Sequence, residues 1–238
     1  MNQPENPQPD IQVLVASMQA HLSSARRSGL RVLSPLQSMG PCAATAEPCA
    51  RETLEAVRED LGACSRCSLC QRRTTIVFGQ GNPRASLVFV GQAPTPADDA
   101  SGEPFCGDEG GMLTNIITRV INLARSDVYL TTIVKCSPPD GRIPAQEEIL
   151  TCMPFLRRQF AAIGPAIVCA LGKSAAQALL GSDRPLDELR GRFHRVGDML
   201  VMPTYDPAFL RVHEDKKHET WKDMLMIMRE LVKTVQAL

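Results

Sequence analysis

The sequence predicts an α/β fold, in which a parallel β-sheet is covered by helices on both faces. Four short runs of apolar, β-forming residues are bounded by turn residues, as buried strands are. Longer segments with apolar residues at helical spacing lie between them, and Pro144 suits the first turn of one such helix. Short apolar strands that alternate with helices are typical of parallel sheets. We expect strands at 86–90, 128–134, 166–171 and 199–203, and helices at 109–124, 145–162, 173–180 and 217–236.

The first 50 residues differ in character from the rest of the chain. Apolar residues recur at helical spacing over 10–28, after Asp10 as a suitable N-cap. Residues 30–50 carry several prolines among small residues, which is typical of a linker. The sequence therefore predicts an N-terminal helix and a Pro-rich flexible linker at 1–50, followed by one domain at 51–238.

The composition is that of an ordinary globular chain, with 238 residues, of which 44% are hydrophobic and 22% charged. The formal net charge is zero, so contact with nucleic acid would depend on a local basic patch. No apolar run approaches the ~18–20 residues of a membrane span. The first residues lack the charged and apolar regions of a signal peptide. We expect a cytoplasmic protein with no membrane partner.

Nine cysteines are many for this chain, and an odd number without a secretion signal argues against a disulfide framework. Cys64 and Cys67 form a CxxC pair, Cys136 follows the second predicted strand, and Cys152 lies on the next helix. Such a set can bind zinc or an iron–sulfur cluster, and the sequence does not separate the two. Cys70 is either a spare thiol or an alternative ligand. The competing interpretation, buried free cysteines that pack as small apolar residues, suits the other cysteines of the predicted domain better.

Residues 87–107 carry the candidate ligand site. The stretch begins as a strand, breaks at Gly91, and continues as a polar loop rich in Pro, Gly and Asp. Open α/β sheets bind their ligands where a strand runs into such a loop and then a helix. The loop holds two adjacent carboxylates, Asp98 and Asp99, and the aromatic Phe105. The carboxylates either take part in chemistry or only form a local Asx-turn.

Taken together, these features resemble the family 4 uracil-DNA glycosylases, the iron–sulfur type, from about residue 51 to the C-terminus. The resemblance rests on six segments, which are specific in their order and spacing: CSRCSLCQRR, VFGQGNPRASLVFVGQAP, GEPFCGDEGGMLTNII, YLTTIVKCSPP, EEILTCMPFL and MPTYDPAFLR. It implies a three-layer α/β/α sandwich with a four-stranded parallel sheet. It also implies a [4Fe–4S] cluster held by Cys64, Cys67, Cys136 and Cys152.

The resemblance further implies that uracil is flipped out of DNA into a pocket at the strand ends. Gly91, Gln92 and Ala93 match the first motif of that pocket, and Phe105 matches the aromatic that stacks on the flipped base. Thr132 stands at the position that reads the edge of the base. These five residues are the expected substrate-binding set.

The last motif, which begins at Asp206, matches the loop that enters the minor groove of DNA. It includes Pro207, and the resemblance implies that Leu210 wedges into the gap left by the flipped base while Arg211 reaches a phosphate. We expect the chain to act as a monomer on DNA that contains uracil or another deaminated base.

Three of the matched positions depart from the family pattern where the chemistry is carried out. Gln92 replaces a carboxylate, Thr132 replaces an Asn that contacts uracil at two points, and Asp206 replaces a His. A His can donate a hydrogen bond to the departing base, whereas an ionised Asp cannot, and losing one such donor costs about 10²–10³ in rate. A protonated Asp could donate, if burial or a neighbouring carboxylate raised its pKa.

The sequence therefore leaves two functional hypotheses. The chain is a glycosylase that hydrolyses the N-glycosidic bond of uracil or another deaminated base at reduced rate, with Asp98, Asp99, Gln92 and Asp206 as candidate catalytic residues. Alternatively, it is a catalytically inactive family member that binds DNA or a protein partner through the retained fold and cluster. A nucleotide-binding protein outside DNA repair fits less well, because the loop lacks both GxGxxG and a P-loop lysine.

Overall fold

The structure is a computed structural model and describes residues 52–236 of the chain. The helix expected at 10–28 and the linker expected at 30–50 lie outside the described residues. None of the helices within 52–236 is long and apolar enough to cross a membrane.

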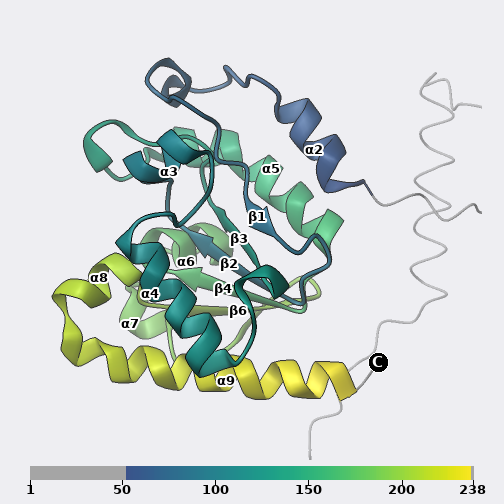
Figure 1. Cartoon of the computed structure of the whole chain (residues 1–238), viewed down its shortest axis with the longest axis vertical. Coiled ribbons are helices and arrows are strands. Elements are labelled where there is room, and N and C mark those ends of the chain that lie inside the picture. The colour runs from purple at the N-terminus through teal and green to yellow at the C-terminus, as the bar shows by residue number, and fades with distance from the viewer. Residues whose placement is uncertain (1–51, 237–238) are drawn as a thin grey trace, which may run out of the picture. The chain divides into compact units, whose positions relative to one another are not determined.

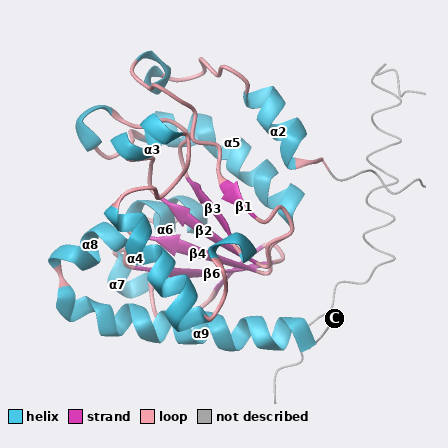
Figure 2. Ribbon diagram, in the orientation of Figure 1, coloured by secondary structure: helices cyan, strands magenta, loops and turns pink. Residues whose placement is uncertain are grey.

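A six-stranded sheet forms the middle of the described domain (Figures 1 and 2). Its strand order is β1-β3-β2-β4-β6-β5. The four central strands run parallel, and β1 and β5 pair with them antiparallel at the two edges. The strands are β1 (Gln80–Gly81), β2 (Leu87–Gly91), β3 (Tyr129–Thr132), β4 (Ile167–Leu171), β5 (His194–Val196) and β6 (Met199–Thr204).

All four predicted strands are present, and they are the four parallel ones. The expected count of four strands is wrong, because two short edge strands extend the sheet to six. Strand β1 has two exposed residues, and β5 has one exposed and two partly exposed residues, so neither contains the apolar run by which a buried strand is recognised. The α/β class itself is confirmed.

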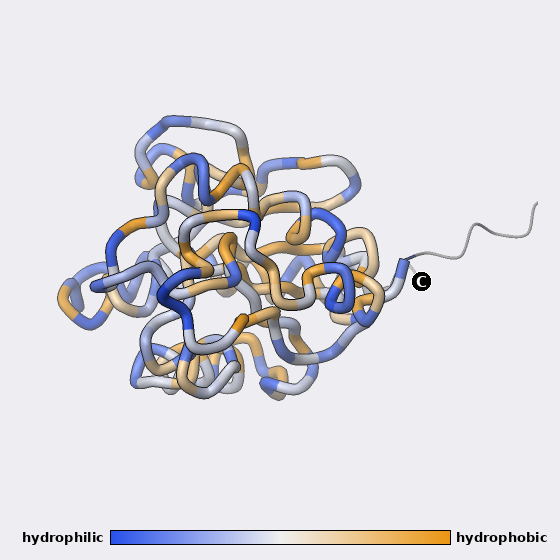
Figure 3. The backbone as a smooth tube through the Cα atoms, turned by 90° about the horizontal axis from the view of Figure 1, so that it is seen from above, coloured by the Kyte–Doolittle hydropathy of each residue, from blue (hydrophilic) through white to orange (hydrophobic). Residues whose placement is uncertain are grey.

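Helices cover both faces of the sheet, which gives the expected three layers (Figure 1). Because successive side chains of a strand point to opposite faces, Val88 and Val90 lie in one core and Leu87 and Phe89 in the other. The first core is completed by α2 (Leu54–Leu61), α5 (Gln146–Ile163) and α6 (Lys173–Leu180). The second is completed by α4 (Asp108–Ile116) and α9 (Lys217–Gln236). In Figure 3 the strongly hydrophilic stretches lie mainly on the outer turns of the domain.

The long helices agree with the predictions except at one end. The helix expected at 109–124 leaves α-helical geometry after Ile116, continues as a π-helix over Ile117–Ile121, and ends at the left-handed residue Asn122. Three short helices were not predicted: α3 (Pro96–Ser101), α7 (Leu186–Leu189) and α8 (Pro207–Val212). Helices of six residues or fewer are too short to show a helical period. The polar loop expected after β2 is therefore partly wrong, since α3 lies within it.

Candidate active site and metal centre

At the carboxyl end of β2, an aromatic ring packs directly against the backbone of a glycine. A Cβ atom on Gly91 would stand 2.7 Å from Cζ of Phe105 and 3.4 Å from Cγ2 of Thr132. Only a glycine at this position leaves room for the ring, so Phe105 and Thr132 both lie against the end of β2. The structure thus brings together three of the residues expected to bind substrate.

The backbone of Phe105 is held in an uncommon conformation. Its φ is 59°, in the left-handed region that is costly for a bulky residue. Arg125 donates hydrogen bonds to the carbonyl oxygens of Pro104 (2.9 Å) and Phe105 (3.1 Å), and to Oγ1 of Thr114 (3.1 Å). A Cβ on Gly110 would stand 1.6 Å from the Phe105 carbonyl oxygen. Arg125 and Gly110 together hold the Phe105 turn against α4.

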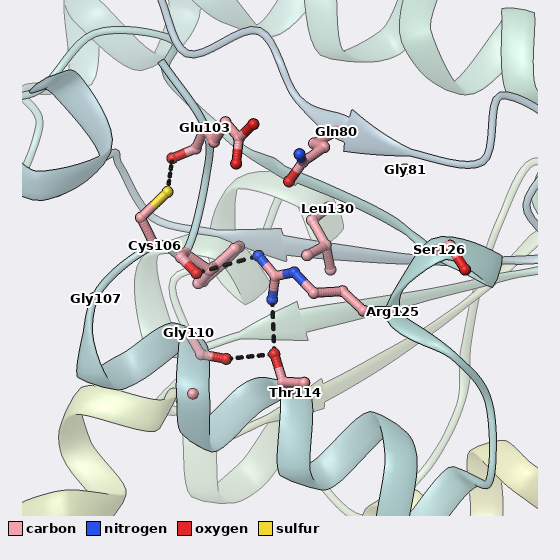
Figure 4. A pocket seen from close by; sticks show the side chains of 12 residues that line it. Gln80, Gly81, Glu103, Cys106, Gly107, Gly110, Thr114, Arg125, Ser126 and Leu130 are labelled. Carbon is pink, nitrogen blue, oxygen red and sulfur yellow. Dashed lines mark hydrogen bonds between the residues drawn. The ribbon is translucent and has the colours of Figure 1, made fainter. Parts of the chain in front are cut away.

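A cavity of about 730 Å³ lies beside this turn, between β1 and α4 (Figure 4). Arg125 reaches through it toward Thr114, and Gln80 and Leu130 line its far wall. Cys106 faces this cavity, where its Sγ lies 3.1 Å from the carbonyl oxygen of Glu103. The thiol is exposed, so the expectation that Cys106 packs as a small buried residue is wrong.

Asp98 and Asp99 are both buried, and all four of their oxygens accept backbone hydrogen bonds. Asp98 accepts from the amides of Thr95 (2.9 Å) and Cys106 (2.7 Å), and forms a capping box with the Thr95 hydroxyl at the start of α3. Asp99 accepts from two amides at 2.7 and 3.2 Å, those of Thr74 and Thr75. The pair therefore fixes α3 to the Phe105 turn and to the segment that follows the CxxC motif.

The side chains of Gln92 and Thr132 each form a hydrogen bond that the sequence does not predict. Gln92 Oε1 accepts a hydrogen bond from Oγ of Ser174 at 2.6 Å. Ser174 lies in the first turn of α6, directly after β4. The Thr132 hydroxyl donates to the Val134 carbonyl oxygen at 2.7 Å, in a side chain that is only 1% exposed. The Thr132 hydroxyl is thus committed to the backbone.

Asp206 is the N-cap residue of α8, and its Oδ1 accepts from the amide of Phe209 at 2.8 Å. Its Oδ2 lies against Gly172, where a Cβ would stand 2.7 Å from that oxygen. Burial raises the pKa of Glu109, on the first turn of α4, and the negative charges of Asp206 and Asp98 raise this pKa further. The strand ends therefore carry a concentration of negative charge.

The expected DNA-binding residues lie on α8, which is a helix rather than a loop. Pro207 is buried in its first turn. Leu210 is only 2% exposed and lines an apolar groove together with Trp221 of α9. Arg211 is exposed and pairs with Asp108 of α4 at 3.1 Å. Leu210 is thus packed inward here, and only Arg211 among these three presents its side chain to the surface.

The four expected metal ligands come from three separate segments that pack against one hydrophobic core. Cys64 and Cys67 precede the short helix η1 (Ser68–Gln71), Cys136 follows β3, and Cys152 lies on α5. Cys136 is buried and the other three pack against the same hydrophobic core. Burial raises the pKa of Cys136 to about 11 and also raises that of Cys152, and the charges of neighbouring cysteines add to both shifts.

Electrostatic contact links the four expected ligands. Cys136 interacts with Cys152 and Cys67, and Cys152 interacts with Cys67 and Cys64. Such a set of thiols suits either a zinc ion or a [4Fe–4S] cluster. Within residues 52–236, no group of three or more His, Cys, Asp or Glu side chains is arranged to hold one metal ion. Arg73 joins two of the segments, because it donates to Cys136 Sγ at 3.2 Å and to the Ala63 carbonyl oxygen at 3.0 Å.

A carboxylate network ties the CxxC segment to α5 independently of any metal. Glu148 accepts hydrogen bonds from Ser68 Oγ (2.8 Å), from the amide of Ala145 (2.7 Å), and from both terminal nitrogens of Arg142 (2.8 and 2.7 Å). The bidentate pair with Arg142, assisted by these donors, lowers the pKa of Glu148 to about 2. This network joins three segments that lie far apart in the sequence.

A buried lysine lies between the pocket and the cysteines. Lys135 is 1% exposed, and its Nζ donates to Thr131 Oγ1 at 2.5 Å and to the Thr132 carbonyl oxygen at 2.8 Å. Burial lowers its pKa to about 8, and the nearby Cys152 and Cys136 oppose this shift. Lys135 therefore fixes the backbone at Thr132 beside two of the expected metal ligands.

Comparison with known proteins agrees with this architecture. Residues 78–226 match the sequence model of the uracil DNA glycosylase superfamily. The chain is 36% identical over 165 residues to a type-4 uracil-DNA glycosylase of Saccharolobus solfataricus. This match covers 66% of this chain and 76% of the relative. It is 37% identical over 161 residues to the type-4 enzyme of Thermotoga maritima, covering 67% of this chain and 83% of the relative. With the type-4 enzyme of Archaeoglobus fulgidus it shares 34% over 184 residues, covering 74% and 92%.

The chain therefore belongs to the uracil-DNA glycosylase superfamily. Within the superfamily its relatives place it in the type-4 family, and the resemblance drawn from the motifs is confirmed. The particular residues at the site stay predictions, because no substrate, DNA or metal ion accompanies the chain.

Sequence reasoning missed three residues around the site: Ser174, Arg125 and Glu109. Ser174 carries a weak signal, since a small polar residue in the first turn of a helix after a buried strand faces the ligand edge of the sheet. Arg125 carries none, because its partners are backbone carbonyls 20 and 21 residues away. Their roles depend on tertiary contacts.

Proposed function

We propose that this protein removes uracil, or another deaminated base, from DNA by hydrolysing the N-glycosidic bond. The observation that carries the proposal is the fixed Phe105 ring over Gly91 at the end of β2, next to Gln92 and within one cluster of strand ends with Asp206. The type-4 relatives are named for this activity. A flat ring held in place is suited to stack on a base that has left the duplex.

The chain's own residues are better suited to stabilise positive charge on the sugar than negative charge on the departing base. Cleavage places positive charge on the sugar and negative charge on the base. Asp206 has one oxygen bound to the Phe209 amide, and no donor to its other oxygen is found among residues 52–236, so this oxygen can stabilise the positive sugar. The same carboxylate opposes the negative base, and the charges of Glu109 and Asp98 add to this opposition. We therefore expect a slow enzyme.

Asp98 and Asp99 have a positioning role in this proposal. Both carboxylates are saturated by backbone amides and hold the turn that carries Phe105. Ala93 follows Gln92 and packs against the first hydrophobic core. The residues that contact substrate are then Phe105, Gln92 and Asp206.

DNA binding is proposed at the α8 face, where Arg211 reaches a phosphate and Pro207 fixes the first turn of the helix. Leu210 enters the gap left by the flipped base only if α8 shifts on binding, because its side chain is buried in the free protein. In this proposal the chain acts as a monomer. A check is the salt dependence of DNA affinity, whose slope should fall by about one charge in Arg211→Ala.

Cys64, Cys67, Cys136 and Cys152 would hold a [4Fe–4S] cluster. The position of all four cysteines at one hydrophobic core supports this, as does the likeness to the type-4 enzymes. When bound, the cluster supplies iron–thiolate links that hold the CxxC segment against α5 and the segment after β3. Its role is structural in this proposal, and no redox step is needed.

The proposal is tested with duplex and single-stranded oligonucleotides that carry one uracil, hypoxanthine or xanthine, incubated with excess protein whose iron content has been measured. We expect free base and an alkali-labile abasic site from at least one oligonucleotide and none from the undamaged control. Binding without any abasic site would support the second candidate, an inactive family member that holds DNA. The observation behind that candidate is the loss of the family's acid, amide and imidazole at Gln92, Thr132 and Asp206.

A further inference from the structure

Gln92 stands where a side chain can meet the edge of a base that rests on Phe105. It directly follows Gly91, the residue against which the Phe105 ring lies. Its side chain is only partly buried, and its single side-chain hydrogen bond among the described residues runs from Ser174 Oγ to Oε1 at 2.6 Å. This contact joins residues 82 apart in the sequence, across the ends of two neighbouring parallel strands.

The hydrogen bond from Ser174 determines which end of the Gln92 amide remains free. An amide side chain has one oxygen acceptor and one nitrogen with two donors. Because Oε1 accepts from Ser174, the nitrogen end is left with its two N–H groups. No acceptor for Nε2 is found in residues 52–236. The free amide nitrogen therefore presents a pair of donors beside the end of β2.

The neighbouring side chains cannot supply this donor. The Thr132 hydroxyl already donates to the Val134 carbonyl oxygen at 2.7 Å. Asp206 accepts from the Phe209 amide, and an ionised carboxylate only accepts. Gln92 is thus the one neutral donor among the three residues that stand at the family's chemical positions.

We infer that Gln92, oriented by Ser174, is the residue that selects the base, and that it selects bases with a carbonyl oxygen where cytosine or adenine carries an amino group. This inference rests on the proposed function and names its substrate class. A fixed N–H donor pairs with the carbonyl of uracil, hypoxanthine or xanthine. It meets an amino group donor to donor, which leaves both groups without partners. A site built in this way rejects the wrong group strongly.

The test measures binding separately from bond cleavage. Oligonucleotides carry 2′-fluoro-2′-deoxyuridine or 2′-fluoro-2′-deoxycytidine at one mispaired position, because the fluorine disfavours positive charge on the sugar and blocks cleavage. Affinities are compared for the natural protein and for Ser174→Ala, Ser174→Thr and Gln92→Leu. Ser86→Ala, an exposed serine directly before β2 and thus at the opposite end of that strand from Gln92, serves as the matched control. Thermal melts show that each variant is folded.

We expect the natural protein to bind the uracil probe at least about tenfold more tightly than the cytosine probe. This preference should fall to about threefold or less in Ser174→Ala and Gln92→Leu, and remain in Ser174→Thr and Ser86→Ala. Ser174→Thr keeps the hydroxyl and thus separates a lost hydrogen bond from a changed fold.

An unchanged preference in both Ser174→Ala and Gln92→Leu, or no preference in the natural protein, would overturn the inference. If the natural protein prefers the uracil probe through Ser174 and Gln92 yet releases no base from ordinary uracil DNA, the inference stands and the proposed glycosylase activity fails. The two results are therefore distinguishable.

Discussion

The cysteine end and the base pocket of this domain are stabilised in different ways. At the cysteine end, contacts join distant segments: Ser68 with Glu148, 80 residues apart, and Arg158 with Glu52, 106 residues apart. In the pocket, the supports are shorter in range. The side chains of Asp98 and Asp206 each accept from an amide three residues away, and Asp99 and Arg125 bind backbone groups 20 to 25 residues away.

This difference explains which residues can change without loss of the fold. Asp98, Asp99 and Arg125 hold the pocket loops, so the side chains that are expected to face the substrate are free to differ from the family pattern. Gln92, Thr132 and Asp206 do differ, whereas the four expected cluster ligands are all present. At the cysteine end each ligand is also part of the packing, and a substitution there affects stability and chemistry together.

The largest expected effect is at the cysteine end. Cys64→Ser should remove one ligand, lower the iron content, and lower the Tm by roughly 10 °C or more, because cluster binding contributes to folding. Iron analysis and thermal melts of the purified variant measure this. Cys106→Ser, at an exposed thiol outside the set, should keep both values. Equal Tm values for the two variants would contradict a structural cluster.

In the pocket, Asp206→His should raise the single-turnover rate of base release by about 10²–10³, because it supplies a donor to the departing base. The same change removes the N-cap of α8 and should lower the free energy of unfolding by about 1 kcal/mol. Asp206→Asn is the control, since it keeps a capping side chain without adding an imidazole. A rate that does not rise would mean that another group limits cleavage.

Glu148→Gln tests the support of the cysteine end that does not depend on metal. Loss of the charged hydrogen bonds should lower the free energy of unfolding at neutral pH by about 1.5–3 kcal/mol. The folded-state pKa of Glu148 lies below its ordinary value, so its contribution is present above about pH 4.5 and is lost as the pH falls toward about 2.

In acid titrations followed by fluorescence, the natural protein should therefore lose more stability than Glu148→Gln across that pH window. Glu147→Gln, at the exposed neighbouring residue, should behave as the natural protein does. If Glu147→Gln and Glu148→Gln gave the same curves, the network would not stabilise the fold.

The smallest expected effect distinguishes two adjacent glycines beside the pocket. Gly110→Ala should cost about 1–3 kcal/mol and weaken uracil DNA binding, because its Cβ would collide with the Phe105 carbonyl oxygen. Gly111→Ala, whose Cβ would meet nothing within 4 Å, should gain about 0.5–1 kcal/mol in a helix. Chemical denaturation of both variants measures the difference. A tolerated Gly110→Ala would mean that the Phe105 turn is not fixed.

Part of the site is predictable from the sequence because it depends on the spacing of neighbouring residues. Thr95 and Asp98 are three residues apart, which is the spacing of a capping box, although the helix that they begin was not expected. The local Asx-turn considered for Asp98 and Asp99 is not formed, because their oxygens accept from amides three to 25 residues away. The inward packing of Leu210 could not be foreseen, because its burial depends on α4 and α9.

The sequence by itself determined the α/β class, the four parallel strands, the long helices and the family, since these follow from periodic apolar residues and from motifs in a fixed order. The tertiary structure decided the two edge strands and the partners of the site residues. The contacts of Gln92 with Ser174, of Arg125 with the Phe105 turn, and of Glu148 with Ser68 join positions that no sequence period connects. Such contacts form only after the sheet brings the strand ends together, and they set which groups remain free to meet a base.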